Sequence, residues 1–242
     1  MPATRKRRFI IFKWVGGSLL ILFAVLAGIA WFLNVKSRPL LTQQIKTLLY
    51  NSTDSLYTIT FSKVSTNIFT GSATLLNVKI SADTNRYNQL VTLKRAPNNL
   101  YTVSLKKLAV KHFHPLTLYR EKKLQIDEIL FDNPEVYMVN RQLDFNENRA
   151  PKPIKSPYGF ISKSLKEFSI KKILFRDASF NYVNKNVNKF DIFSIDDFNI
   201  TLVDLLVDST SFEDSTRFYL LKDVLLNLKN YDYATPDSMY NI

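Results

Sequence analysis

An apolar run near the N-terminus, residues 14–33, constrains this chain more than any other feature. It has no charge and no proline, and it matches the ~20 residues that a helix needs to cross a bilayer core. Basic residues crowd positions 5–8 before it, whereas only Lys36 and Arg38 follow closely. By the positive-inside rule the N-terminus stays in the cytoplasm and the rest is exported. We predict a basic tail with a membrane anchor over residues 1–35 and an exported domain over residues 36–242.

A cleaved signal peptide is the alternative interpretation of this segment. Gly28 and Ala30 have the spacing of a small-x-small cleavage site. The apolar run is nevertheless longer than a signal-peptide core, and bulky Trp31 and Phe32 follow that site at once. These features favour an uncleaved anchor, and both interpretations export the bulk of the chain.

The composition excludes some partners and some kinds of site. The formal charge is +12, but much of the excess lies in the N-terminal tail, so the exported part is only mildly basic. No nucleic-acid-binding motif accompanies it, and we expect no nucleic-acid partner. The chain has no cysteine, which excludes disulfides and thiolate metal sites.

Hydrophobic periodicity predicts a mostly β, α+β fold. Leu41, Ile45 and Leu48 indicate a short amphipathic helix over residues 40–50. From Tyr57 onward apolar and polar residues mostly alternate, which is typical of half-buried strands. We predict two short helices, at Pro115–Glu121 and over residues 158–166, a proline-rich linker over residues 151–157, and otherwise sheet.

A repeat of 44 residues is the second organising feature. LQIDEILFDNPEVYMVN, which begins at Leu124, matches FSIKKILFRDASFNYVN, which begins at Phe168. A shorter unit, two charged residues between two apolar ones, recurs five times. The charged pairs are Lys106-Lys107, Asp127-Glu128, Lys171-Lys172, Asp196-Asp197 and Lys222-Asp223.

Two consecutive polar residues shift the phase of an alternating strand by one, as a β-bulge does. Repeated on successive strands, this device predicts a curved antiparallel sheet. The alternative is a hairpin turn at each pair, which the absence of glycine, asparagine and proline from the pairs disfavours.

The assembled pattern resembles the AsmA-like family of bacterial envelope proteins, which includes TamB and YhdP. The resemblance rests on the basic tail, the anchor, the helix over residues 40–50, GSATLLNVKI from Gly71, and KLQIDEILFDNPEVYMVNR from Lys123. It implies an inner-membrane protein with a periplasmic, U-shaped β-groove that binds phospholipid and serves outer-membrane biogenesis. Family members usually carry more strands, so we expect either a fragment or a sheet that another chain continues.

The predicted lipid site is an apolar wall without catalytic residues, metal or cofactor. Its candidate residues are Val103, Leu105, Ile126, Ile129, Phe131, Val136, Ile170, Ile173, Phe175 and Phe180. The alternative is that these side chains form an ordinary core between sheet and helices.

Two features were weighed as chemical sites. His112 and His114 have a metal-ligand spacing but no evident third ligand, which favours a surface pair at a strand end. Asp127 and Glu128 are neighbours on a strand and are expected to point to opposite faces, so they form no acid/base pair. No enzyme motif was found, and we predict that the protein is not an enzyme.

Two functions therefore remain in view. The first is binding of phospholipid acyl chains in a β-groove during lipid transport. The second is an assembly module that recruits strands of outer-membrane protein clients, or of other envelope proteins, by β-augmentation at an edge near Leu228.

Overall fold

The computed structural model describes residues 46–47, 49–67, 70–147, 156–186 and 189–229. The chain divides into two compact units, Met1–Ile59 and Thr60–Ile242. The predicted anchor over residues 14–33 lies outside the described residues. Within the described ranges, no helix has both the length and the apolar character needed to cross a membrane.

In the first unit, residues 49–52 are helical, and β1 (Tyr57–Thr60) follows them. Most of the helix predicted over residues 40–50 lies outside the described residues. In β1, Tyr57 and Ile59 are buried and alternate with exposed residues, which confirms the period-two strand predicted here.

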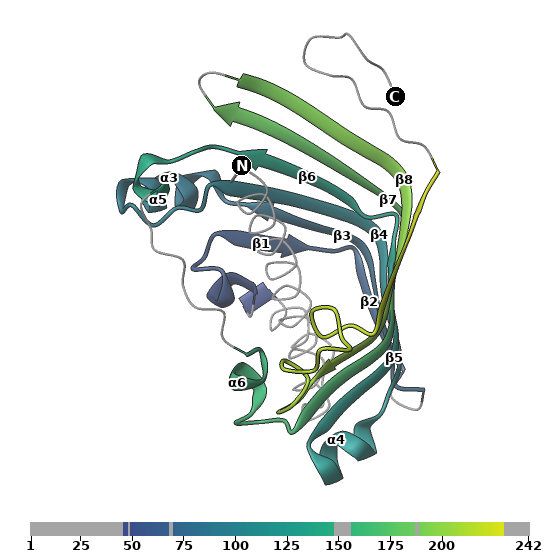
Figure 1. The fold of residues 1–242 in the computed structure, drawn as a ribbon. Coiled ribbons are helices and arrows are strands. Elements are labelled where there is room, and N and C mark those ends of the chain that lie inside the picture. The colour runs from purple at the N-terminus through teal and green to yellow at the C-terminus, as the bar shows by residue number, and fades with distance from the viewer. Residues whose placement is uncertain (1–45, 48, 68–69, 148–155, 187–188, 230–242) are drawn as a thin grey trace. The chain divides into compact units, whose positions relative to one another are not determined.

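The second unit is built mainly from strands, and its helices are short (Figure 1). Its strands are β2 (Lys63–Asn67), β3 (Ser72–Ala82), β4 (Asn99–Phe113), β5 (Lys123–Asp132), β6 (Glu135–Asn140), β7 (Glu167–Asn186), β8 (Lys189–Val207) and β9 (Asp223–Leu228). Its helices are α3 (Thr84–Thr92), α4 (Pro115–Glu121), α5 (Asp144–Glu147) and α6 (Tyr158–Ile161). The mostly β prediction is confirmed.

The strands of this unit form a mixed sheet in the order β3-β4-β5-β7-β8-β9, with β2 beside β3 and β6 between β4 and β7. Pairing is antiparallel except that β5 and β6 both run parallel to β7. The prediction of an antiparallel sheet is therefore wrong at this pairing. The physical reason is the connection between β6 and β7, which spans residues 141–166 and carries the chain back to the end where β5 began.

The parallel pairing is the repeat itself. Leu124 pairs with Phe168 and Phe131 with Phe175, each 44 residues further along. The same offset continues through β6, where Asn140 pairs with Asn184. Each residue of β5 and β6 therefore lies beside its own repeat equivalent in β7.

A row of residues without ladder pairs crosses the sheet, and we call it the Asn77 row. It comprises Asn77, Lys106, Asn133 and Asp177, each of which lies between residues that do pair across neighbouring strands. Asn77, Asn133 and Asp177 have left-handed φ angles of 50°, 51° and 50°. Asparagine and aspartate tolerate this conformation better than other non-glycine residues do.

A second such row, the His112 row, crosses the same strands further along. It comprises Gly71, His112, Asp127, Lys171 and Asp204. Gly71, His112 and Asp204 have φ angles of 58°, 51° and 55°. Because the interruptions lie side by side, the register is the same on both sides of this row.

The two rows include one residue from each of three charged pairs, Lys106-Lys107, Asp127-Glu128 and Lys171-Lys172. Four of the five pairs lie within strands and Lys222-Asp223 lies at the start of β9, so the hairpin-turn alternative is wrong. Ile126 and Ile129 are three residues apart and both fully buried, as are Ile170 and Ile173, which confirms the predicted change of phase. A bulge would also shift the register, but the register shifts only between β7 and β8, from Phe175 to Phe180. Figure 1 shows the long strands of this sheet bending together along their lengths.

The helices were predicted in part. α4 has the predicted bounds Pro115–Glu121, and α6 ends at Ile161, earlier than expected. α3 and α5 were missed. The signal for α3 was Asp83, whose side chain accepts a hydrogen bond from the backbone N–H of Arg86 (2.9 Å), a helix N-cap.

We expect Gly71→Ala to destabilise the chain strongly. A Cβ at Gly71 would lie 2.1 Å from the carbonyl oxygen of Phe113, and φ is +58°. The left-handed conformation alone costs an alanine about 1–2 kcal/mol, and the clash adds to it. Urea unfolding of the purified chain measures the loss. Gly159→Ala is the matched control, because its Cβ meets nothing within 4 Å, and an equal effect of the two substitutions would contradict this account.

Candidate functional site

The strand register places the ten predicted groove residues on one face of the sheet, which we call the apolar face. Val103, Val136 and Phe180 lie side by side on β4, β6 and β7. On β5 and β7 the equivalents pair as Ile126 with Ile170, Ile129 with Ile173, and Phe131 with Phe175. Leu105 is two residues from Val103 and shares its side of β4. The interruptions at the two rows keep these groups facing the same way.

The apolar face combines fully buried and half-buried side chains. Ile126, Ile129, Ile170 and Ile173 are at most 1% exposed, whereas Phe131, Val136, Phe175 and Phe180 are half-buried. The rings of Phe131 and Phe175 stack in parallel, with centroids 4.7 Å apart and planes 5° apart. Parallel pairing of repeat equivalents produces this stack, because it sets like side chains next to each other.

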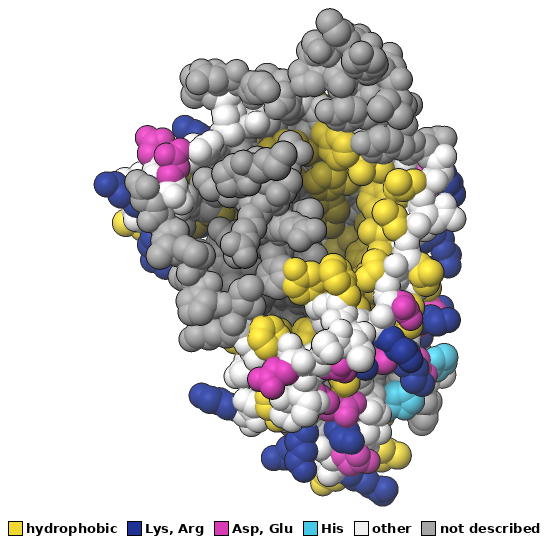
Figure 2. All heavy atoms as spheres, viewed as in Figure 1, with side chains coloured by type: hydrophobic (Ala, Val, Ile, Leu, Met, Phe, Trp, Pro, Cys, Tyr) yellow, Lys and Arg dark blue, Asp and Glu magenta, His cyan; other side chains and the backbone are white. Residues whose placement is uncertain are grey.

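Residues that the sequence analysis did not select extend the same face. Met138 of β6 pairs with Tyr101 and Tyr182. On β8, Ile200 pairs with Phe175 and Leu202 with Ile173. The sequence signal for these residues is that apolar residues recur at every second position in the strand segments between charged pairs. Figure 2 shows hydrophobic side chains gathered in a hollow over the strands that Figure 1 labels β6–β8.

The opposite face, which we call the polar face, carries ion pairs across the strands, although Ala109 and Leu130 are buried on it. Asp127 accepts from Lys171 Nζ at 2.7 Å, and its carboxylate lies 3.1 Å from His114 Nε2. Glu128 pairs with Lys111 Nζ at 2.6 Å. Asp127 and Glu128 therefore both lie on the polar face, and the prediction that they point to opposite faces is wrong. The interruption at Asp127 changes the phase, so two consecutive side chains face solvent.

The two histidines lie where β4 ends and α4 begins. His112 Nδ1 is 3.7 Å from Asp127 Oδ2, and the side chains of His112 and His114 are 63% and 43% exposed. They form a surface pair at a strand end, as predicted. In the described ranges, no group of three or more His, Cys, Asp or Glu side chains is arranged to hold a metal ion.

The electrostatics of the polar face centre on Asp127. The hydrogen bond from Lys171 lowers the pKa of Asp127 below its ordinary value of 3.8, and the His114 contact acts in the same direction. Partial burial opposes this effect but does not cancel it. The arrangement links β4, β5 and β7 across the His112 row.

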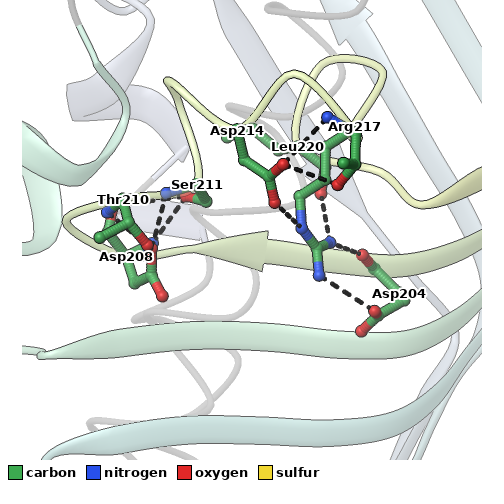
Figure 3. Close-up of polar contacts among 8 residues, drawn as sticks. Asp204, Asp208, Thr210, Ser211, Asp214, Arg217 and Leu220 are labelled. Carbon is green, nitrogen blue, oxygen red and sulfur yellow. Dashed lines mark hydrogen bonds and ion pairs between the residues drawn. The ribbon is translucent and has the colours of Figure 1, made fainter.

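A loop between β8 and β9 is held to the sheet by Arg217 (Figure 3). Its Nη1 donates to the carbonyl oxygen of Asp204 (2.6 Å), and its Nη2 lies 3.1 Å from Asp204 Oδ2. Nε pairs with Asp214 at 3.4 Å. Asp204 belongs to the His112 row, so the guanidinium satisfies a carbonyl at a position where the strand ladder is interrupted. No sequence pattern indicated this contact, which joins a loop residue to a strand residue 13 positions earlier.

No protein-family model matches the chain, and no curated protein gives a significant match to it.

We expect Asp127→Asn to lower the free energy of unfolding at neutral pH and to have little effect in acid. A carboxyl whose pKa is depressed in the folded state contributes stability above its ordinary pKa of 3.8 and loses it as the pH falls through the folded-state value. Urea denaturation of wild type and variant across this pH range measures the difference. Asp132→Asn removes the same charge from the same strand and is the control. A difference that persists well below the ordinary pKa would contradict this account.

Proposed function

We propose that this protein is anchored in a bacterial inner membrane and binds phospholipid acyl chains along the apolar face, as part of lipid transport and outer-membrane biogenesis. The observation that carries the proposal is the continuity of that face. It runs across β4, β5, β6, β7 and β8 and through both interrupted rows, and the positions named above on these strands carry apolar side chains. Acyl chains are long and apolar, and burying them against such a surface removes both from water.

The elements of the described unit support this choice of ligand. They include one sheet and only short helices, of four to nine residues. A sheet with one apolar face needs something to bury it against. The opposite face is lined by ion pairs, so headgroups and water suit that side and acyl chains do not. Together with the anchor over residues 1–35, this supports a U-shaped groove in the periplasm whose curvature shelters the chains.

We expect photo-crosslinking residues at Val136 and Phe175 to form phospholipid adducts in cells. Both side chains are half-buried on the apolar face. Adducts are identified by mass spectrometry of the purified chain. The matched controls are Tyr137 and Leu174, which are the next-door residues on the same strands and point to the other face.

The controls decide what the adducts mean. Lipid adducts at Val136 and Phe175 but not at Tyr137, Leu174 or the exposed Lys172 support a lipid-binding face. If every site instead forms adducts only with other parts of the protein, the face is a closed core and the proposal is overturned.

The alternative function is an assembly module that captures client strands by β-augmentation, and β9 is the observation that favours it. β9 ends the strand order and pairs with β8 alone among the described strands. All six of its residues are exposed, and Leu225 and Leu226 are 60% and 58% exposed although they point to opposite faces. A long apolar edge of this kind accepts a further strand.

If β9 captures a strand, Leu225→Arg should reduce recovery of crosslinked client protein at least several-fold and leave lipid adducts at Phe175 unchanged, because Leu225 pairs with Thr201 on the side opposite to the apolar face. Charges on an edge strand oppose pairing with another strand. Loss of lipid adducts with unchanged protein adducts would contradict the assembly function.

A further inference from the structure

We propose that the end of the sheet formed by α4 and α6 docks onto the surface of an anionic phospholipid bilayer. The inference is separate from the lipid-binding face, because it concerns side chains on the two helices and their flanks. It starts from the parallel pairing of β5 and β7. α4 leads into β5 and α6 is followed by β7, so parallel strands bring both helices to the same end of the sheet (Figure 1).

The junctions of the two helices are joined directly. The backbone N–H of Lys166 donates to the carbonyl oxygen of Lys122 at 2.8 Å. Lys123 and Glu167, the first residues of β5 and β7, pair in register. The two helix-strand junctions therefore form one surface and not two separate ones.

Each helix projects a large apolar side chain from this surface. Leu116 of α4 is 66% exposed and Phe160 of α6 is 75% exposed. They are separated by 44 residues, which is also the offset between paired residues of β5 and β7. Tyr119 lies on the same side of α4 as Leu116, three residues later, and is 86% exposed. Side chains this exposed contribute nothing to the packing of the sheet.

Basic side chains surround these apolar ones. Arg120, Lys122, Lys163 and Lys166 are exposed, and none of the four forms an ion pair with another described residue. The neighbouring acid Glu121 is neutralised by Lys123 at 3.4 Å. Figure 2 shows Lys and Arg side chains, with Asp and Glu side chains among them, next to hydrophobic ones at the end where Figure 1 places α4.

This combination fits a bilayer better than a protein partner. Protein interfaces are depleted of lysine and need an extended, complementary surface. Apolar and aromatic side chains that protrude among lysines and arginines are typical of segments that lie in the headgroup region, where the rings enter the acyl boundary and the cations meet anionic lipid. An anionic bilayer satisfies both kinds of side chain at once.

The absence of cysteine from the chain makes a direct test possible. Single cysteines replace Leu116, Phe160 and Ile192 in the full-length chain and carry a nitroxide spin label. Ile192 is the matched control, because it is 69% exposed but lies on β8 toward the other end of the sheet. The chain is reconstituted into phosphatidylglycerol-containing vesicles, or held in neutral nanodiscs to which such vesicles are added. The first arm tests docking onto the bilayer in which the chain is embedded. The second arm tests docking onto a separate bilayer.

We expect labels at Leu116 and Phe160 to collide readily with oxygen and poorly with a water-soluble nickel complex in one of the arms, and the label at Ile192 to show the reverse. Replacing Arg120, Lys122, Lys163 and Lys166 with glutamine should reduce the protection of these labels from the nickel complex at least several-fold. Glutamine at Lys106, Lys107, Lys172 and Lys185 removes as many charges elsewhere and should leave it unchanged.

Three results would overturn the proposal. The first is labels at Leu116 and Phe160 that stay as accessible to nickel as the label at Ile192 in both arms. The second is shielding from oxygen and nickel together, which indicates contact with protein. The third is shielding of the labels by the bilayer that persists after the four basic residues are replaced. That result would show that attraction to anionic lipid is not part of the interaction.

Discussion

The structure depends on interruptions that coincide from strand to strand. Hydrogen bonds tie each residue of a sheet to a neighbouring strand, so a strand that bends alone loses its register. In the His112 row every strand is interrupted opposite its neighbour's interruption, and the pairing resumes unchanged on the far side. Left-handed residues supply the bend, and they are the types that adopt this conformation at least cost: glycine at position 71, asparagine at 77 and 133, and aspartate at 177 and 204. A continuous apolar face on a bent sheet is the result.

Parallel pairing of the 44-residue repeat is the second source of order. It places each side chain of β5 beside its equivalent in β7, so that isoleucine meets isoleucine and Phe131 stacks on Phe175. The same parallel pairing brings the short helices that precede β5 and β7 to one end of the sheet, where Leu116 and Phe160 are exposed.

These features assign different chemistry to different surfaces of one sheet. The apolar face carries apolar side chains on successive strands, and the polar face is crossed by pairs such as Lys111 with Glu128. The edge at β9 exposes apolar residues on both sides of the strand, and Arg217 fixes the loop that leads to it. Passive binding of lipid requires only the first of these surfaces, whereas strand capture requires the edge. The sheet therefore supports lipid binding most directly, because the aligned interruptions keep the apolar face continuous.

Local patterns in the sequence determined much of this. Alternation predicted the strands, Pro115 and its neighbours predicted α4, and apolar residues three apart across a charged pair predicted that strands would continue through it with a change of phase. These are properties of a few consecutive residues, which short-range sterics and burial control. The direction of β5 and β6 against β7 was decided only in the tertiary structure, because it depends on how the connection over residues 141–166 returns the chain. The common face of Asp127 and Glu128 follows from that change of phase. That neighbouring strands are interrupted at the same level, so that their register is unchanged, was decided only in the tertiary structure.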